Sequence, residues 1–228
     1  MDMIALYMIS FSSCVSVDGA RQLGTLNMVR DLEVKSVCAE LTTNGNFLDT
    51  SLSFPDADSF IGTPCRFLIF HVKNLKRKIA VEVEVEDTKG GVRTIICNTA
   101  QSVARLLPAY ASLPLQLTDG WNKIALDLGS LTKACFRAEY KHANRVRIYA
   151  NCRLRRVFFS DKHYYNAQLP SPLQFLNDTN TTSLTPQVET IHSRLTPHRP
   201  SMSSFAKGSG PGNNDTQRSN VSTAVRAN

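Results

Sequence analysis

In the stretch from Arg145 to Asp161, apolar and other side chains alternate strictly as far as Arg155. A period of two residues is that of a β-strand with one buried face and one exposed face. We therefore expect one strand here, with Ile148, Cys152 and Leu154 in the core. Its other face would carry the guanidinium groups of Arg145, Arg147, Arg153 and Arg155.

Such a row of arginines is a candidate docking surface for an acidic partner. A guanidinium group stays charged and presents a planar fork of donors to carboxylates or phosphates. The alternative is an ordinary solvated face whose arginines pair with neighbouring acids, which is the default for the wet side of a sheet. A second basic stretch, KNLKRK, is predicted to form a loop that carries Lys73, Lys76, Arg77 and Lys78.

Length and charge limit the possibilities further. The chain has 228 residues, of which 42% are hydrophobic, so it is long enough for one domain with a proper core and a tail. Its net charge of +7 favours an acidic partner, but does not choose among nucleic acid, anionic membrane and an acidic protein surface.

The six cysteines are spread almost evenly and include no C-x-x-C motif and no Cys/His pair at zinc-finger spacing. A structural zinc site therefore has little support, and we expect no metal or cofactor. A chain of this size does not need disulfides to stabilise it. We expect reduced, intracellular thiols.

The apolar run from Met3 to Val17 superficially suggests a secretory signal. No Lys or Arg occurs before Arg21, however, so the positively charged start of such a signal is missing. The run is also too short to span a bilayer. We expect a buried first strand within a segment that covers residues 1–33.

Short strand patterns separated by turns fill the middle of the chain. Phe67 to Val72 is apolar on both faces, which suits a central strand and makes His71 a core residue rather than a ligand. Ile79 to Cys97 reads as a hairpin with a turn at DTKGG. The three carboxylates on its wet face favour surface charge over catalysis, because no nucleophile, histidine or metal-ligand set accompanies them; they are Glu82, Glu84 and Glu86.

The next pattern places a turn at Asp119-Gly120 before a strand with Ile124, Leu126 and Leu128 on one side. Gly129 to Tyr140 is the best helical candidate, with Ser130 placed to cap it. Thr99 to Leu107 is a second helical candidate that ends at Pro108. Many short strands with one or two short helices predict a single antiparallel β-sandwich of jelly-roll type.

Residues 177–228 differ from the rest of the chain. They are rich in Asn, Thr, Ser, Pro and Gly and poor in apolar residues. Such a segment buries too little apolar surface to offset the entropy of ordering, so we expect a disordered polar tail.

Several motifs together resemble the cilia- and flagella-associated protein 20 family. They are KNLK from Lys73, DGWN from Asp119, ANCRLRRV from Ala150, FSD from Phe159 and LP from Leu169. The resemblance covers Val34 to Leu176 and implies a β-sandwich domain over residues 34–176. The family's usual opening, rich in aromatic residues and glycine, is not recognisable in Met1 to Asp31, so residues 1–33 are expected to be divergent.

The resemblance implies a structural protein rather than an enzyme. Family members sit in the axoneme of cilia and flagella, at the inner junction where the B-tubule closes onto the A-tubule of a doublet microtubule. Tubulin and neighbouring junction proteins would be the partners. The basal body, cytoplasm and nucleus are further expected locations.

Tubulin is strongly acidic, so the resemblance agrees with docking through the basic residues. The expected contacts are Arg145, Arg147, Arg153, Arg155, Arg156, Lys73, Lys76, Arg77 and Lys78. A structural role is expected for Asp119, Gly120, Trp121, Asn122 and Cys152.

Two other kinds of binding compete with this interpretation. A nucleic-acid-binding or nuclear role would need exposed aromatic side chains among the arginines, and only Tyr149 fits. A carbohydrate-binding module would need an exposed aromatic platform, whereas the single tryptophan, Trp121, is predicted to be in the core. Neither implies a membrane partner.

Overall fold

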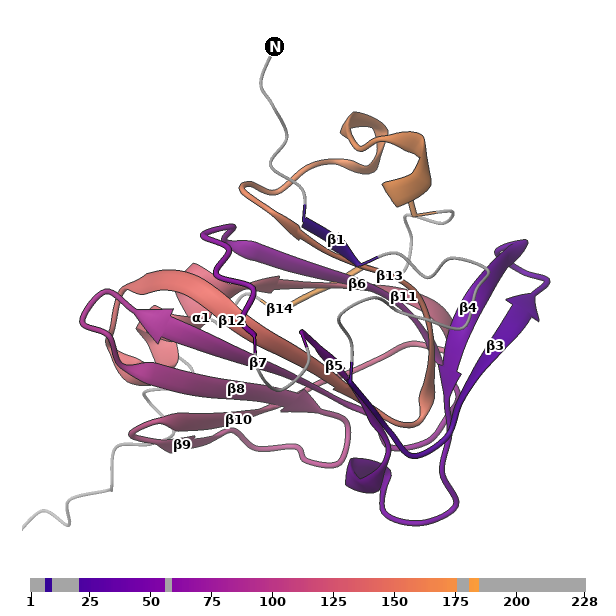
Figure 1. The fold of residues 1–228 in the computed structure, drawn as a ribbon, viewed down its shortest axis with the longest axis horizontal. Helices are drawn as coiled ribbons and strands as arrows, with labels where there is room; N and C mark the ends of the chain where they lie inside the picture. The colour runs from indigo at the N-terminus through magenta and orange to yellow at the C-terminus, as the bar shows by residue number, and fades with distance from the viewer. Residues whose placement is uncertain (1–6, 10–20, 56–58, 176–180, 185–228) are drawn as a thin grey trace, which may run out of the picture. The chain divides into compact units, whose positions relative to one another are not determined.

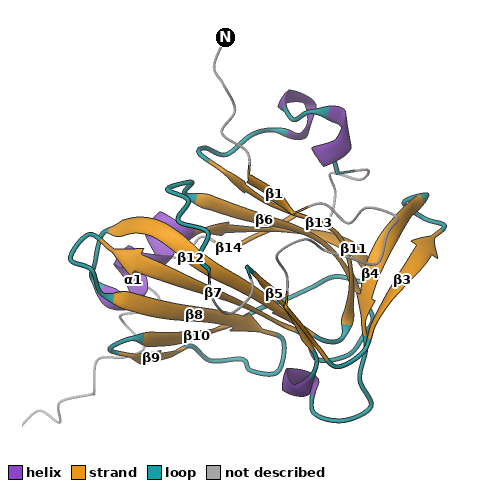
Figure 2. Ribbon diagram, in the orientation of Figure 1, coloured by secondary structure: helices purple, strands orange, loops and turns teal. Residues whose placement is uncertain are grey.

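The computed structural model describes residues 7–9, 21–55, 59–175 and 181–184, all of which fall within residues 1–195, one of two units of the chain. They form a β-sandwich of two seven-stranded sheets (Figures 1 and 2). In sheet A the order is β14-β11-β6-β13-β4-β3, with β1 also against β13; in sheet B it is β2-β5-β12-β7-β8-β10-β9.

Most neighbouring strands are antiparallel, as expected, and the exceptions are the parallel pairs β8 with β10 and β11 with β14. The strands of sheet A are β1 (Tyr7–Ile9), β3 (Leu26–Asp31), β4 (Ser36–Leu41), β6 (Phe67–Asn74), β11 (Gly120–Asp127), β13 (Cys152–Ser160) and β14 (Thr181–Leu184). Those of sheet B are β2 (Arg21–Leu23), β5 (Ser51–Phe54), β7 (Ala80–Asp87), β8 (Val92–Asn98), β9 (Arg105–Leu107), β10 (Tyr110–Pro114) and β12 (Tyr140–Tyr149).

The core lies between the facing sides of the two sheets. Sheet A contributes Phe70, Ile124 and Phe159, and sheet B contributes Val83 and Ile148, each at most 1% exposed. Each large apolar side chain buried in this way stabilises the fold by about 1.5–3 kcal/mol. The predicted central strand and the predicted hairpin are confirmed as β6 and as β7 with β8.

The single strand predicted over Arg145 to Asp161 is wrong. The stretch forms two strands, β12 in sheet B and β13 in sheet A, joined at Ala150 and Asn151. Asn151 is buried and holds this connection in place, because its Oδ1 accepts from the backbone N–H of Thr43 at 2.8 Å and its own N–H donates to the carbonyl of Lys78 at 2.9 Å. The predicted burial of Ile148, Cys152 and Leu154 is confirmed.

The one α-helix among the described residues, α1 (Leu128–Phe136), packs against β6, β7, β11 and β12. It is shorter than predicted, and its cap is Asp127 rather than Ser130. The Asp127 carboxylate accepts from the backbone N–H of Ser130 at 3.0 Å and also binds Arg66, which fixes the start of the helix. None of the described helices has the length and apolar character needed to cross a membrane.

Two other predictions need correction. Thr99 to Leu107 contains no helix; it is a turn followed by β9. The predicted disordered tail contributes β14, which pairs along the outer edge of β11. Backbone hydrogen bonds to a free sheet edge need no apolar side chains, so composition gave no sign of this strand. The rest of that tail, and most of the predicted first strand, lie outside the described residues.

Three short 3₁₀ helices complete the described elements. They are η1 (Phe47–Asp49), η2 (Asn166–Gln168) and η3 (Ser171–Leu173). The last two belong to the segment Tyr164–Phe175, which follows β13. Because Leu169 and Leu173 pack on Ile69 and Phe158, this segment covers part of the outer face of sheet A.

Candidate partner-binding surface

The predicted arginines do not form one surface. Since β12 and β13 belong to different sheets, Arg145 and Arg147 lie on the outer face of sheet B, whereas Arg153 and Arg155 lie on that of sheet A. None of the four is fully exposed. The predicted single docking face is therefore wrong.

Arg147 is held by its neighbours in sheet B. Its Nε donates to Ser53 Oγ at 2.9 Å, and its Nη1 lies 3.4 Å from Glu82 Oε1. The Tyr149 hydroxyl donates to the other Glu82 oxygen at 2.8 Å. Hydrogen bonding with Tyr149, reinforced by Glu82 and Glu84, raises the pKa of Arg147. Tyr149 is itself buried, so its ring is not available to stack a base.

Arg153 belongs to a charge network centred on a carboxylate that the sequence did not single out. Asp31 is 2% exposed and accepts from Lys73 Nζ at 3.0 Å, Arg153 Nη1 at 2.8 Å and Trp121 Nε1 at 3.3 Å. Arg153 also pairs with Glu40, and Lys73 with Glu33. Two cations thus face three carboxylates, and this part of sheet A has no excess positive charge.

The hydrogen bonds decide the charge state of Asp31. Burial alone raises its pKa, but the bonds from Arg153, Lys73 and Trp121 outweigh burial and hold the pKa well below its usual value of 3.8. No short sequence motif predicts this network, because Asp31 and Arg153 are 122 positions apart.

Arg155 and Arg156 follow a register shift after Leu154 in the pairing of β13 with β6. Arg155 donates to the carbonyl of Gln174 at 3.1 Å and Arg156 to that of Pro172 at 3.3 Å. Burial, with the charge of Arg156, lowers the pKa of Arg155. Both side chains therefore hold the Tyr164–Phe175 segment against sheet A.

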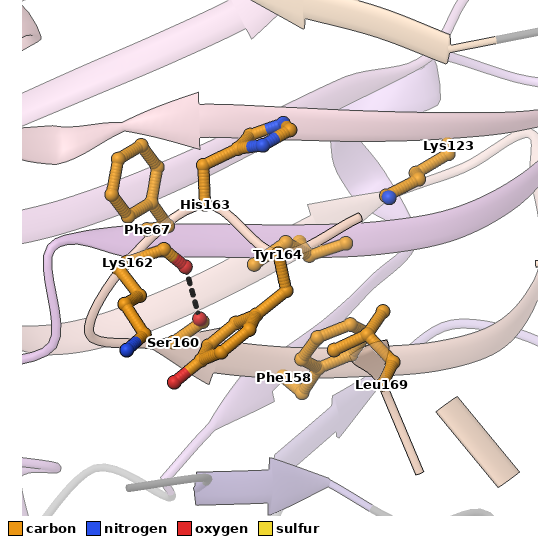
Figure 3. Close-up of a pocket in the computed structure, with 10 residues that line it drawn as sticks. Phe67, Lys123, Phe158, Ser160, Lys162, His163, Tyr164 and Leu169 are labelled. Atoms are coloured by element: carbon orange, nitrogen blue, oxygen red, sulfur yellow. Dashed lines mark hydrogen bonds between the residues drawn. The ribbon is translucent and has the colours of Figure 1, made fainter. Parts of the chain in front are cut away.

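A hollow lies beneath this segment (Figure 3). Its walls include Phe67, Phe158, Tyr164 and Leu169, with Lys123 at one end and Ser160 bonded to the carbonyl of Lys162. The enclosed volume is only about 10 Å³, room for about one water molecule. It is too small for a cofactor.

The loop between β6 and β7 is different, because its tip is exposed. Lys76 forms an exposed ion pair with Asp119 at 2.9 Å, and Arg77 donates to the carbonyl of Thr43. Among the described residues, neither Arg77 nor Lys78 has a carboxylate partner. The loop borders an open depression whose other side is formed by Thr99, Leu115, Gln116 and Leu117. This is the part of the predicted contact set that remains accessible and uncompensated.

The residues assigned to the fold are placed as predicted. Trp121 is 4% exposed and packs with Val34, Cys38 and Phe175 on the outer side of sheet A. Asn122 is fully buried, and its Oδ1 accepts from the backbone N–H and hydroxyl of Thr118, both at 2.9 Å. Gly120 has a φ of +76°, which suits glycine in the turn after Asp119.

Two further residues bear on possible chemistry. His71 is buried as predicted, and burial lowers its pKa to about 3. Cys152 is also fully buried, which raises its pKa above the usual value of 9.0. No three of the His, Cys, Asp and Glu side chains in the described ranges are grouped to hold a metal ion.

Three curated proteins, each named Cilia- and flagella-associated protein 20, are similar to this chain over 149 residues. That of Caenorhabditis elegans is 32% identical over 65% of this chain and 73% of its own length. The protein of Chlamydomonas reinhardtii is 32% identical over 65% of this chain and 78% of its own length. The protein of Paramecium tetraurelia is 33% identical over 64% of this chain and 77% of its own length. A solved structure, the "Structure of PfGH50B", aligns with this chain with a TM-score of 0.35 at 11% identity, over 64% of this chain and 23% of that one.

The family model described as the CFA20 domain matches residues 5–177. The match begins well before Val34, so it includes nearly all of the segment predicted to be divergent. It also spans more than half of the chain. The chain therefore belongs to the CFA20 domain family.

Proposed function

We propose that this protein is a non-catalytic structural component of the ciliary or flagellar axoneme that binds tubulin at the inner junction of doublet microtubules. There it would stabilise the connection of the A- and B-tubules together with neighbouring junction proteins, and so support motility. Membership of the family and the names of the curated relatives support the location in cilia or flagella. One observation supports the contact itself, the exposed loop Lys76–Lys78.

The loop fits an acidic partner because the charges of Arg77 and Lys78 are not matched by carboxylates in the described part of the chain. The arginines of β12 and β13 are poorer candidates, because they are partly buried and bind acids or carbonyl groups of this chain, whereas Arg77 and Lys78 are exposed. The contact set is therefore narrower than the sequence predicts. Nucleic-acid binding has less support than the sequence suggests, because Tyr149 is buried and cannot stack on a base. Carbohydrate binding also has less support, because Trp121 is buried and cannot form an exposed aromatic platform.

The experiment is co-sedimentation with microtubules, compared with binding to single-stranded and duplex nucleic acid at the same salt concentration. The double variant Arg77→Glu/Lys78→Glu should bind microtubules at least about tenfold more weakly, because like charges across an interface cost several kcal/mol. The control variant Lys89→Glu/Lys133→Glu makes the same change in net charge at two other exposed lysines. It should bind like the wild type.

Two results would contradict the proposal. Wild-type binding by the loop variant, with an unchanged circular dichroism spectrum, would remove the loop from the mechanism. If the wild type bound nucleic acid but not microtubules, the partner would be nucleic acid rather than tubulin.

A further inference from the structure

The depression beside the loop Lys76–Lys78 carries charge of one sign only. Three of the residues that line it are the cations Lys76, Arg77 and Lys78, and the others are uncharged. Lys76 pairs with Asp119, which lies outside the lining, but the two side chains are 72% and 75% exposed, so this pair contributes little. The charge of the depression therefore selects an anionic ligand.

The loop is held in one shape before any partner binds. The backbone N–H of Lys76 donates to Asn74 Oδ1 at 2.8 Å, and the carbonyl of Lys78 accepts from the N–H of the buried Asn151 at 2.9 Å. A ligand thus meets a backbone that is already ordered, which lowers the entropic cost of binding.

The opposite side of the depression is neutral. It is formed mainly by the segment Leu115–Leu117, which connects β10 to β11. Gln116 is exposed and Leu117 is half-buried, so this side offers an amide and an aliphatic group. The depression has a volume of about 660 Å³ and opens to solvent, which leaves room for several residues of an extended chain.

The depression suits a short acidic peptide better than a nucleic acid. Its positive charge does not continue into β6, because Lys73 is bound to Asp31 and Glu33. No aromatic side chain in the described part of the chain lines it, so it offers no surface on which a base could stack. A nucleic acid strand binds through many phosphates and stacked bases, whereas a short peptide needs only a few charge pairs.

Side chains two residues apart in an extended peptide point to the same side. Arg77 keeps further N–H donors besides the one that it gives to the carbonyl of Thr43, and Lys78 is exposed. We propose that this depression binds an extended acidic segment of the partner protein, with two carboxylates on Arg77 and Lys78 and the neighbouring residues against Gln116 and Leu117. The inference rests on the proposed contact with tubulin, and assigns that contact to a peptide segment rather than to a folded surface.

The probe is a capped, fluorescently labelled hexapeptide of glutamate, titrated into the full chain at fixed ionic strength and followed by anisotropy. A hexapeptide of glutamine and a single-stranded oligonucleotide with the same number of charges are the comparisons, and both should bind more weakly. Arg77→Gln/Lys78→Gln should weaken binding of the glutamate peptide at least about tenfold. The control Lys89→Gln/Lys133→Gln removes the same charge at two other exposed lysines and should bind like the wild type.

Two variants of Gln116 test the depression separately from the loop. Gln116→Glu places a carboxylate on the opposite side at an exposed position, so it should weaken binding of the glutamate peptide, whereas Gln116→Lys should strengthen it. Circular dichroism checks that both variants fold. Unchanged binding by both would show that the peptide contacts only the tip of the loop, and would overturn the proposal. Equally tight binding of the oligonucleotide would refute the choice of a peptide.

Co-sedimentation separates this inference from the proposed function. An excess of the glutamate peptide should release the wild-type chain from microtubules. If the chain bound microtubules but not the peptide, the peptide site would be wrong while the contact with tubulin stood. If the chain bound the peptide but not microtubules, the site would stand and tubulin would not be its partner.

Discussion

Trp121 donates its indole N–H to the carboxylate of Asp31, 3.3 Å away, although the two residues are 90 positions apart. The bond joins β11, next to one edge of sheet A, to β3 at the other edge. Between them, Lys73 of β6 and Arg153 of β13 bind the same carboxylate. One side chain therefore connects four strands on the outer face of this sheet.

Asp31→Asn should destabilise the fold and remove part of its dependence on pH. The variant keeps the shape but loses the charge that accepts from Lys73 and Arg153, at a cost of about 2–3 kcal/mol. The folded-state pKa of Asp31 is depressed, so its contribution is complete above the unfolded pKa and is lost as pH falls toward the folded pKa. The free energies of unfolding of wild type and variant, measured with urea, should therefore differ most near neutral pH. The difference should shrink progressively as the pH falls below about 5. A constant difference down to strongly acidic pH would contradict this.

Trp121→Ala should cost about 3–5 kcal/mol in the free energy of unfolding, because a buried ring is replaced by a cavity. Trp121→Phe is the comparison, since it keeps most of the packing with Val34 and Phe175 and loses only the bond to Asp31. Chemical denaturation measures both. Unchanged stability of the alanine variant would show that the ring does not support the fold and would reopen a peptide- or carbohydrate-binding role for it.

Deletion of residues 177–228 should expose the outer edge of β11. Hydrogen exchange of the backbone amides between Lys123 and Leu126 should then become faster, because these residues pair with β14. A deletion that begins at residue 185 keeps β14 and should leave this exchange unchanged. The domain should still fold in both cases, since every described residue of the main core precedes residue 177. Equal exchange in the two truncations would show that β14 does not protect the edge.

The thiols of Cys38, Cys97 and Cys135 should be unreactive in the native protein. Burial raises the pKa of Cys97 to about 12 and those of Cys38 and Cys135 to about 11, so very little thiolate is present near pH 8. Alkylation followed by peptide mass spectrometry should label all three only after unfolding. Rapid native labelling at any of them would show that the surrounding packing opens readily.

The alternation between Arg145 and Leu154 predicts correctly that its apolar positions are buried, but it misses the burial of Tyr149 and Asn151 and does not show that two sheets share these residues. Val146 and Ile148 face the core from sheet B, and Cys152 and Leu154 face it from sheet A. A connection of two residues preserves the even-odd pattern, so the period continues across the change of sheet. Periodicity indicates which face of a strand is buried, but it cannot indicate which sheet the strand belongs to.

The candidate site was predicted only in part, for a related reason. The exposure of the loop Lys76–Lys78 could be predicted, because the run KNLKRK is polar and basic and lies between two apolar strand patterns. The pairing of Arg153 with Asp31 and Glu40 depends on contacts between distant strands, which no local pattern contains. The capping role of Asp127 could have been predicted from the sequence, because Asp is a preferred N-cap residue and Asp127 lies three residues before Ser130.

The connection at Ala150 and Asn151 gives the sandwich a mechanical property. It joins β12, which lies between β5 and β7, directly to β13, which has strands of sheet A on both sides. A shearing load that slides one sheet over the other would therefore pull on two residues of covalent backbone as well as on the apolar contacts between the sheets. Tension applied to sheet A would pass along the chain into the interior of sheet B.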